Sequence, residues 1–473
     1  MKKSKILYSI LFFGICLVPS VGMFFTHQEN SSENRTLAEF PSFKTEDGSI
    51  NFDWLSQAGD YFQDHFAFRN ELVTANAVVN GRVLGVSTAS GVIQGTDGWL
   101  YYKDSLSNYL GTDPLSERSL FNIAHTLSMM QTYLEGRNVD FLFTVAPNKN
   151  SLYDEHMPYY DKVKVSDEKN LDRLVPWLSS EGVHYADLYH MLLSQDETLY
   201  HKRDSHWNNK GAAMASDLLL DTLEKEHDSW DEEPYQVRTD FEGDLDTMLY
   251  PSMPQLEDEV YYDRQTTYAY VGEVGSNFDP KITTVNPVKS GSLVMYRDSF
   301  GNALLPFMAD AYANAYFSRG IPYQLSDIDT TGADTVVVER AERFLPEMAA
   351  SAPVMAGPAV VPESLLNQDA EDGATDLASK TVGTMVQITG RIKPEYLDTD
   401  TQIYLRINQA GVYEAFPVDV KLEDGTLDDG GFCLYLYSAS LAPGENNLEV
   451  VTKDDQGYHI IYSHTFEPAK IRL

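Results

Sequence analysis

Residues 291–313, GSLVMYRDSFGNALLPFMADAYA, have the pattern of a strand, a turn and a helix. Four apolar residues run together from 293 to 296, which is typical of a short buried strand. Ser299 follows this strand and precedes a helix that the spacing predicts from about 303 to 312. Its hydroxyl would lie at the rim of a sheet, beside the free N–H groups of a first helical turn. This position suits a nucleophile, but serine is also a common helix cap, and the stretch alone leaves both interpretations open.

A polar segment farther upstream contains the partners that a serine nucleophile needs. Asp204 and His206 are two residues apart, so on an extended segment both side chains project to one side. A histidine can act as the general base and a carboxylate can orient it, so these residues and Ser299 predict a Ser–His–Asp triad. The alternative is a hydrogen-bonded loop histidine. A metal site is not expected, because His201 and His206 are five residues apart on a non-helical stretch.

These segments together resemble a known family. Asp204, Ser205, His206 and Trp207, followed later in the chain by Ser299, are similar to the SGNH-hydrolase-like alginate O-acetyltransferases, the AlgX, AlgJ or DHHW proteins. In that family the Asp-x-His pair precedes the serine, as it does here. Ser205 is a departure from the second position of the DHHW tetrad. Further stretches that match are residues 33–38 with Pro41, residues 64–69 and residues 95–101.

The resemblance implies a fold, an activity and partners. The expected fold is α/β, an SGNH-like parallel sheet flanked by helices. The expected activity is transfer of acetyl groups onto a cell-surface or secreted polysaccharide through an acetyl-serine at Ser299, with His206 as base and Asp204 orienting it. A membrane-bound O-acyltransferase would supply the acetyl groups. Neither a cofactor nor a metal is expected.

Two other functions are compatible with the same chain. A carbohydrate O-acetylesterase of this fold would use the same triad and differ in whether the acceptor site excludes water. A non-catalytic glycan-binding scaffold of an exopolysaccharide export complex would need no triad. The intact set of Asp204, His206 and Ser299 disfavours the scaffold.

The composition limits the possible partners. The chain has 473 residues and a net charge of −36, which indicates two or three domains with a strongly acidic surface. Nucleic acids and anionic membrane surfaces both require a positive face, so this charge disfavours them. It also makes a polyanionic polymer a poor substrate unless a local basic cleft overrides the global charge. Cys16 and Cys433 are the two cysteines, and no disulfide is expected within the mature chain.

Residues 1–27 predict an export signal or a membrane anchor. Three lysines precede an apolar run over 6–25, which places the N-terminus in the cytoplasm and the remainder outside. The run is long enough to span a bilayer uncleaved, and Ser20 or Gly22 offers a cleavage site. The predicted location is the extracytoplasmic face of a bacterial cell membrane, anchored, or the secreted fraction.

Residues 28–348 are predicted to form the SGNH-like catalytic domain. A mostly helical stretch over 33–86 and a hairpin over 92–102 come first. Residues 227–289 do not fit the alternation of strands and helices seen in the remainder, which suggests inserted β-structure. Strands alternating with helices in the remainder predict a mostly parallel sheet with helices on both faces. The predicted strands are 139–145, 184–188, 293–296, 315–318 and 335–339, and the predicted helices are 116–135, 168–180 and 210–226.

Sites in such sheets form beyond the C-terminal ends of the strands, which defines further candidates. Asn148 and Lys149 follow the first strand, where they are either oxyanion donors or plain loop residues. The backbone N–H groups of Ser299 and Gly301 are the other candidate oxyanion donors. Arg319, Arg340 and Arg343 follow later strands, and the sequence does not single one out. The residues expected to make oxyanion or substrate contacts are Gly301, Asn148, Lys149, Arg319 and Trp207.

The C-terminal part differs in composition. Residues 349–380 are rich in Ala, Pro, Gly and Asp without periodicity, which predicts a linker. Short β-rich runs over 381–473 predict an all-β sandwich, and the resemblance implies a carbohydrate-binding module here. Its tyrosines either stack on sugars or belong to the core. They are Tyr404, Tyr413, Tyr435, Tyr437, Tyr458 and Tyr462.

Overall fold

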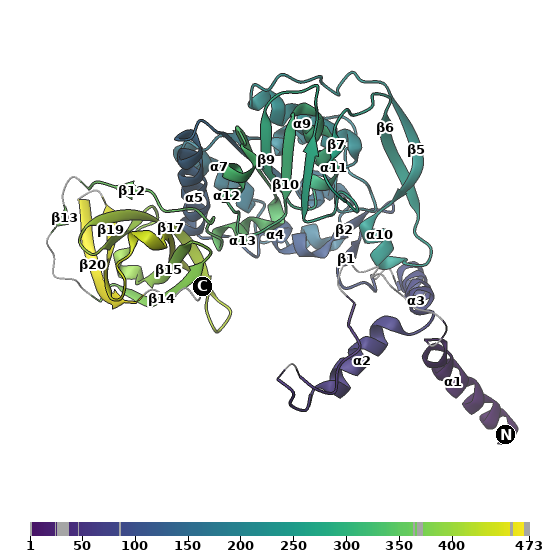
Figure 1. Ribbon diagram of the computed structural model, residues 1–473. Helices are drawn as coiled ribbons and strands as arrows, with labels where there is room; N and C mark the ends of the chain where they lie inside the picture. The colour runs from purple at the N-terminus through teal and green to yellow at the C-terminus, as the bar shows by residue number, and fades with distance from the viewer. Residues whose placement is uncertain are drawn as a thin grey trace.

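The computed structural model describes residues 2–23, 25, 37–45, 47–84, 87–362, 365–366, 372–454 and 457–467. Residues 33–36 of the motif over 33–38 lie outside the described residues. An N-terminal helical arm, a central α/β body and a C-terminal β body follow one another along the chain (Figure 1). The predicted fold class, an α/β sheet with flanking helices followed by an all-β part, is confirmed.

The central sheet has seven strands within the described part of the chain, in the order β4-β3-β11-β9-β10-β8-β7. Five are parallel, as predicted, and two antiparallel strands at one edge come from the stretch that fits the alternation poorly. The parallel strands are β3 (Asp140–Ala146), β4 (Tyr185–Ala186), β9 (Ser292–Tyr296), β10 (Asn314–Ser318) and β11 (Thr335–Ala341), and the antiparallel ones are β7 (Ala269–Tyr270) and β8 (Lys281–Val285).

Helices cover both faces of this sheet, which is why β9 reads as an unbroken apolar run. Val294 and Tyr296 contribute to the core on one face, and Leu293 and Met295 to the core on the other. The first face is covered by α5 (Glu117–Glu135), α7 (Asn170–Ser180), α12 (Ser326–Thr331) and α13 (Leu345–Ala349), and the second by α8 (Leu188–Leu193), α9 (Asn209–Thr222) and α11 (Gly301–Ala311).

The predicted hairpin forms ahead of the central sheet in the chain. Strands β1 (Val92–Gln94) and β2 (Leu100–Tyr102) pair antiparallel, and Asp97 and Gly98 adopt positive φ angles of 52° and 82° in the turn between them. The remaining short elements are α4 (Leu106–Leu110), α6 (Lys149–Leu152), and an inserted unit of β5 (Tyr235–Glu242), α10 (Asp244–Leu249) and β6 (Leu256–Tyr262). Strands β5 and β6 form an antiparallel ribbon.

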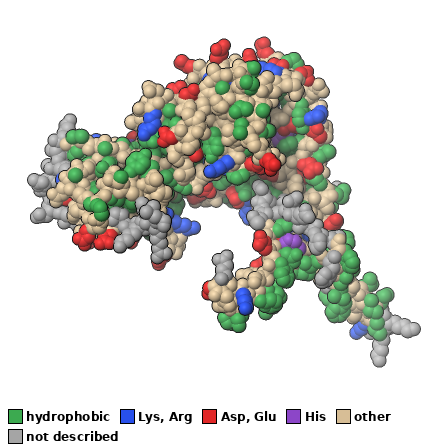
Figure 2. All heavy atoms as spheres, viewed as in Figure 1, with side chains coloured by type: hydrophobic (Ala, Val, Ile, Leu, Met, Phe, Trp, Pro, Cys, Tyr) green, Lys and Arg blue, Asp and Glu red, His purple; other side chains and the backbone are tan. Residues whose placement is uncertain are grey.

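The N-terminal arm consists of α1 (Lys2–Gly22), α2 (Trp54–His65) and α3 (Arg69–Leu84). The window Lys5–Gly22 has a mean hydropathy of 1.8 and is long and apolar enough to cross a membrane, a property that signal sequences share. Hydrophobic side chains gather along the arm in Figure 2, and Phe52 and Leu55 are exposed.

The C-terminal body is a mostly antiparallel sheet folded around its own core, with one parallel pair between β13 and β20. Strand β14 begins at Ala374, so regular β-structure starts inside the stretch 349–380 that composition predicts to be a linker. The strands are β12 (Ala359–Val360), β13 (Leu365–Leu366), β14 (Ala374–Val382), β15 (Met385–Ile392), β16 (Gln402–Ile407), β17 (Gly411–Lys421), β18 (Leu427–Tyr437), β19 (Asn446–Asp454) and β20 (Gly457–Phe466).

The tyrosines of this body differ in exposure. Tyr404 and Tyr435 are buried, whereas Tyr437 is exposed. Tyr413, Tyr458 and Tyr462 are partly buried and pack against the apolar clusters of the β body. Most of the aromatic rings that the sequence offers for sugar stacking therefore contribute to packing.

Helix α5 joins the two bodies through polar contacts. Arg118 donates hydrogen bonds to the carbonyls of Asp398, Thr399, Thr401 and Asp429. Farther along the same helix, His125 lies between Glu181 of the α/β body and Glu414 of β17, at 2.8 and 3.1 Å. The apolar core of this face also continues into β17 and β18.

Candidate active site

The three predicted catalytic residues lie in one hydrogen-bonded chain. Ser299 lies between the end of β9 at Tyr296 and the start of α11 at Gly301. Its Oγ is 2.8 Å from Nε2 of His206, and Nδ1 of His206 is 2.7 Å from Oδ1 of Asp204. The same Asp204 oxygen accepts the backbone N–H of His206, so one carboxylate orients both the ring and the backbone of His206.

The turn that carries Ser299 is held by buried polar groups. Asp298 accepts the backbone N–H of Phe300 and, through its other oxygen, the N–H of Ala341 in β11. Trp207 donates its indole N–H to the carbonyl of Phe300 at 3.2 Å. A side chain at Gly301 would place Cβ 2.6 Å from Cβ of Arg297, so the close packing of helix against strand requires glycine.

Lys149 holds the backbone of the segment that carries Asp204 and His206. Its buried ammonium donates to the backbone carbonyls of His201, Lys202 and Asp204, which shapes the loop that carries Asp204 and His206. Burial lowers the pKa of Lys149 to about 8, against the opposing effect of Asp204 and other carboxylates. The sequence leaves Lys149 open as an oxyanion donor or a plain loop residue, and in the structure its ammonium is hydrogen-bonded to this loop.

Asn148 is also buried in the α/β body. Its backbone N–H donates to Glu342 at 2.9 Å, and its side chain is buried. Neither Asn148 nor Lys149 lines the two cavities that contain Ser299. The physical reason is that α6 begins directly after β3, so these residues pack into the body before the chain reaches the cleft.

Ser299 lies where two cavities meet. Four residues line both of them, namely His206, Asp244, Ser299 and Arg319. The first cavity is otherwise lined by Tyr102, Ser205, Met248, Arg297, Asp298, Arg340, Arg343 and Phe344. The second is otherwise lined by Asp204, Trp207, Asn209, Phe241, Glu242, Thr247, Glu259, Asn277, Phe278, Asn302 and Ala303.

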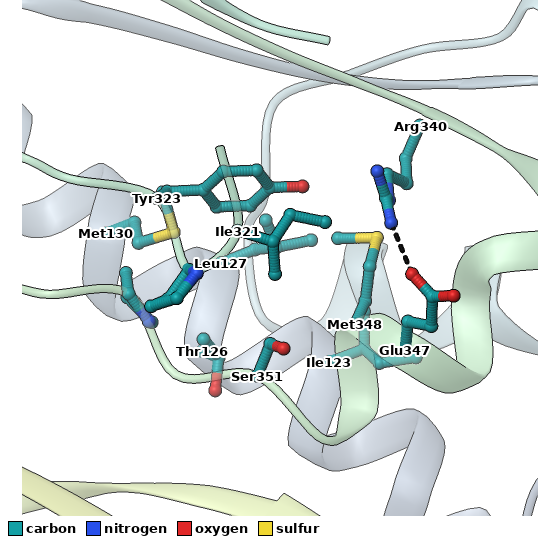
Figure 3. Close-up of a pocket in the computed structure, with 12 residues that line it drawn as sticks. Ile123, Thr126, Leu127, Met130, Ile321, Tyr323, Arg340, Glu347, Met348 and Ser351 are labelled. Carbon is teal, nitrogen blue, oxygen red and sulfur yellow. Dashed lines mark hydrogen bonds and ion pairs between the residues drawn. The ribbon is translucent and has the colours of Figure 1, made fainter. Parts of the chain in front are cut away.

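The first cavity is basic despite the acidic chain. Arg319, Arg340 and Arg343 all line it, although the sequence singles out none of them. Arg340 is paired with Glu347 at 2.6 Å, at the edge of a separate apolar pocket (Figure 3). No described carboxylate forms an ion pair with Arg343, which instead lies 4.8 to 5.5 Å from the ring centroids of Tyr102, Phe300 and Phe344.

The electrostatics favour a charged Asp204 and a basic His206. Burial alone would raise the pKa of Asp204, but the charge and hydrogen bond of His206 and the N–H of Asp244 hold it well below its usual value. Burial alone would lower the pKa of His206, but Asp204 and then Asp244 raise it. A histidine in this setting can accept the proton of Ser299 and stabilise the resulting imidazolium.

Asp244 is the site residue that sequence reasoning missed. It comes from the inserted unit between β5 and β6, where no motif or periodicity marks it. The ligand atoms of Asp204, His206 and Asp244 lie within 4.8 Å of one another, a spacing that could also hold a metal ion. All four carboxylate oxygens already accept hydrogen bonds from nearby residues, which favours an acid–base cluster.

Comparisons with known proteins find a family match over part of the chain. Residues 92–281 match the family described as SGNH hydrolase-like domain, acetyltransferase AlgX, a range that contains Asp204 and His206 and ends before Ser299. No curated protein sequence matches the chain.

Several solved structures are similar in part. A DHHW family protein from Eubacterium siraeum is 17% identical, with 47% of this chain and 85% of that one covered at a TM-score of 0.39. The O-acetyltransferase domain of Pseudomonas putida AlgJ is 16% identical, with 54% and 92% covered and a TM-score of 0.38. Pseudomonas aeruginosa AlgX is 14% identical, with 74% and 87% covered and a TM-score of 0.36. The family match confirms the resemblance that the motifs indicate: residues 92–281 are similar to the SGNH hydrolase-like domain of the acetyltransferase AlgX.

Proposed function

We propose that this protein is an extracytoplasmic O-acetyltransferase that moves acetyl groups onto hydroxyls of a polysaccharide through an acetyl-serine at Ser299. The observation that carries the proposal is the continuous hydrogen-bonded chain from Asp204 through His206 to Ser299, at the junction of two cavities. The match of residues 92–281 to an acetyltransferase family supports acyl transfer as the reaction class.

The proposed reaction has two halves. In the first, Ser299 Oγ attacks the carbonyl carbon of an acetyl donor while His206 Nε2 takes the hydroxyl proton, and His206 then returns that proton to the departing donor group. In the second, His206 takes the proton of a sugar hydroxyl, whose oxygen attacks the acetyl carbon of acetyl-Ser299, and His206 then returns the proton to Ser299 Oγ as the acyl–serine bond breaks. Asp204 keeps the imidazole in the tautomer that both halves need. Backbone N–H groups of Ser299 and Gly301 are the proposed oxyanion donors.

The proposed setting follows from the arm and the family. Helix α1 would anchor the protein or direct its export, with residues 28–348 as the catalytic unit outside the membrane. A membrane-bound O-acyltransferase is the proposed acetyl donor, and a polysaccharide is the proposed acceptor. The basic lining of the first cavity supports access of an anionic group to Ser299 in spite of the net charge of −36.

The test uses the full chain in a mild detergent with a chromogenic acetyl ester, alone and with added oligosaccharides, beside Ser299→Ala. Mass spectrometry of the intact protein should detect an acetyl group on the wild type and none on the variant. Transfer of that group to an oligosaccharide supports the proposal. Release of acetate to water only, with every acceptor tried, would replace it with an O-acetylesterase, and equal background in both proteins would leave a non-catalytic scaffold.

A further inference from the structure

A second carboxylate lies beside the triad. Asp244 is the first residue of α10, in the unit inserted between β5 and β6, and it lines both cavities that contain Ser299. Its Oδ2 is 3.7 Å from Nδ1 of His206, behind the closer Asp204 oxygen at 2.7 Å. The proposed mechanism uses Asp204 and leaves Asp244 without a role.

Asp244 makes several hydrogen bonds to the segment Asp204–His206. Its backbone N–H donates to Oδ2 of Asp204 at 2.7 Å. Its Oδ1 accepts the backbone N–H of Ser205 at 2.8 Å, and its Oδ2 accepts the Ser205 hydroxyl at 2.6 Å. The Ser205 hydroxyl is itself 3.2 Å from Nδ1 of His206. Asp244 therefore contacts the segment at Asp204 and at Ser205, the two residues that precede His206.

The glycine before Asp244 lets the inserted unit lie close to the backbone of Arg203. A Cβ on Gly243 would lie 2.3 Å from the carbonyl oxygen of Arg203, a distance that no side chain allows. The carbonyl of Arg203 accepts the N–H of Asp246, and the Arg203 guanidinium pairs with the Asp246 carboxylate. The inserted unit is thus in van der Waals contact with residues 203–206 along several consecutive residues.

We propose that Asp244 is a positioning residue of the catalytic centre: it fixes the Asp204–His206 segment through Ser205 and places a second negative charge beside His206. The activity readout of this inference rests on the proposed function, whereas its titration readout does not. Ser205 stands where the DHHW tetrad has histidine, and here its hydroxyl links the base to Asp244.

The surrounding charges are consistent with this role. Burial and the charge of Asp204 raise the pKa of Asp244 to about 6, so it is ionised above about that pH. The other charged groups near His206 are Asp204, which is hydrogen-bonded to it, and Arg343, which opposes protonation. His201 and Lys149 act on Asp204 from the far side of the segment, and Lys149 also faces Asp244. Above pH 6 the two carboxylates together favour the imidazolium that the reaction forms.

A purely structural role would be different in one measurable respect. If Asp244 only holds backbone, removing its charge while keeping its shape would change stability but not the basicity of His206. The pKa of His206 is therefore the discriminating quantity, and it can be measured whether or not the protein transfers acetyl groups.

The experiment compares wild type with Asp244→Asn in the full chain, labelled with 15N-histidine, with His206→Gln used to assign the His206 signals. The pKa of His206 should fall by about one unit in Asp244→Asn, because an opposite charge within 4–6 Å is removed. The acid limb of the pH profile for acetylation of Ser299 should move to lower pH by the same amount. An unchanged pKa of His206 in folded Asp244→Asn would overturn the proposal.

The matched control is Glu257→Gln. Glu257 belongs to the same insertion and accepts the backbone N–H groups of Lys202 and Arg203, so it holds the same segment without facing His206. Its substitution should leave the pKa of His206 unchanged, and an equal fall there would mean that any loosening of the insertion suffices, against our proposal.

Wild type alone supplies a second test if Asp244→Asn does not fold. The His206 signals should show a second inflection near pH 6, where Asp244 ionises. A single-proton titration curve would contradict the proposal. Failure to acetylate Ser299 at any pH would instead count against the proposed function, while the titration results would still stand.

Discussion

His206 Nε2 lies 2.8 Å from Ser299 Oγ, although the two residues are 93 positions apart in the chain. The serine is presented by a turn between β9 and α11, and the histidine by a loop between α8 and α9. Both α9 and α11 pack on the same face of the sheet, so the contact depends on the packing of these helices. Substitutions at Ser299 or His206 therefore test both this packing and the proposed proton transfer.

Ser299→Ala should abolish acetylation of the protein and reduce ester turnover by at least about 1000-fold, because the attacking oxygen is lost. His206→Gln should have a comparable effect, because no other described base lies within hydrogen-bond distance of Ser299 Oγ. Stopped-flow release of the chromophore and intact-protein mass spectrometry measure both effects. A burst of normal size in either variant would contradict the assigned roles.

Asp204→Asn should reduce the rate of acetylation by about 10⁴-fold while leaving the fold intact, because a Ser–His–Asp triad loses about that factor when its carboxylate becomes an amide. The amide can present an N–H to Nδ1 of His206, which stabilises the wrong tautomer of the base. The check is the rate of acetylation beside thermal unfolding of the same sample. Retained activity with an unchanged pH profile would show that Asp204 does not orient His206.

Arg343→Gln should raise the KM for an acceptor that carries a carboxylate by about tenfold, because one charge-assisted hydrogen bond is lost. Arg343 lines the first cavity and has no carboxylate partner among the described residues, so its charge is available to a ligand. The KM for a neutral acetyl ester should stay unchanged. The control is Arg137→Gln, at an exposed site remote from the cleft. A similar rise with a neutral acceptor would mean that Arg343 only shapes the cavity.

His125→Gln should lower the free energy of unfolding in a pH-dependent way. Burial alone would lower the pKa of His125, but hydrogen bonds to Glu181 and Glu414 outweigh it and raise the pKa to about 9. Because the folded-state pKa is above the unfolded value, this stabilisation is fully present below about pH 6.5 and is lost as the pH rises through about 9. The difference from wild type should be on the order of 3 kcal/mol at pH 6 and should shrink by pH 10.

Urea unfolding at several pH values measures this difference. His190→Gln is the control, because His190 is exposed and its pair with Asp187 contributes little in water. A loss of stability that is equal at pH 6 and pH 10 would show that His125 acts through packing alone.

Local pattern alone was enough to predict several elements and the triad. The apolar run of β9 has to be buried on both faces, and the alternation of strands and helices leads to a parallel sheet with the site at its C-terminal edge. Asp204 and His206 were recognisable because a two-residue spacing on extended backbone keeps both side chains on one side. The Asp97-Gly98 turn was recognisable because positive φ angles favour these residue types.

Other site residues depended on tertiary structure because their contacts join segments with no local signal. Asp244 lies in an insertion without periodicity and reaches the triad only when its helix packs on residues 203–206. Lys149 could be an oxyanion donor or a plain loop residue on sequence grounds, and only the structure shows that its ammonium donates to the carbonyls of His201 and Lys202.

What the sequence by itself determined was the order of elements and, within the predicted triad, the turn that carries Ser299 and the pairing of His206 with Asp204, because each depends on residues that are close in the chain. What only the tertiary structure decided was the environment of that triad. The approach of Arg319, Arg340 and Arg343 to one cavity, and of Asp244 to His206, depends on which strand ends and insertions become neighbours. Burial then determines the charges, because a group's pKa responds to distances that folding alone creates.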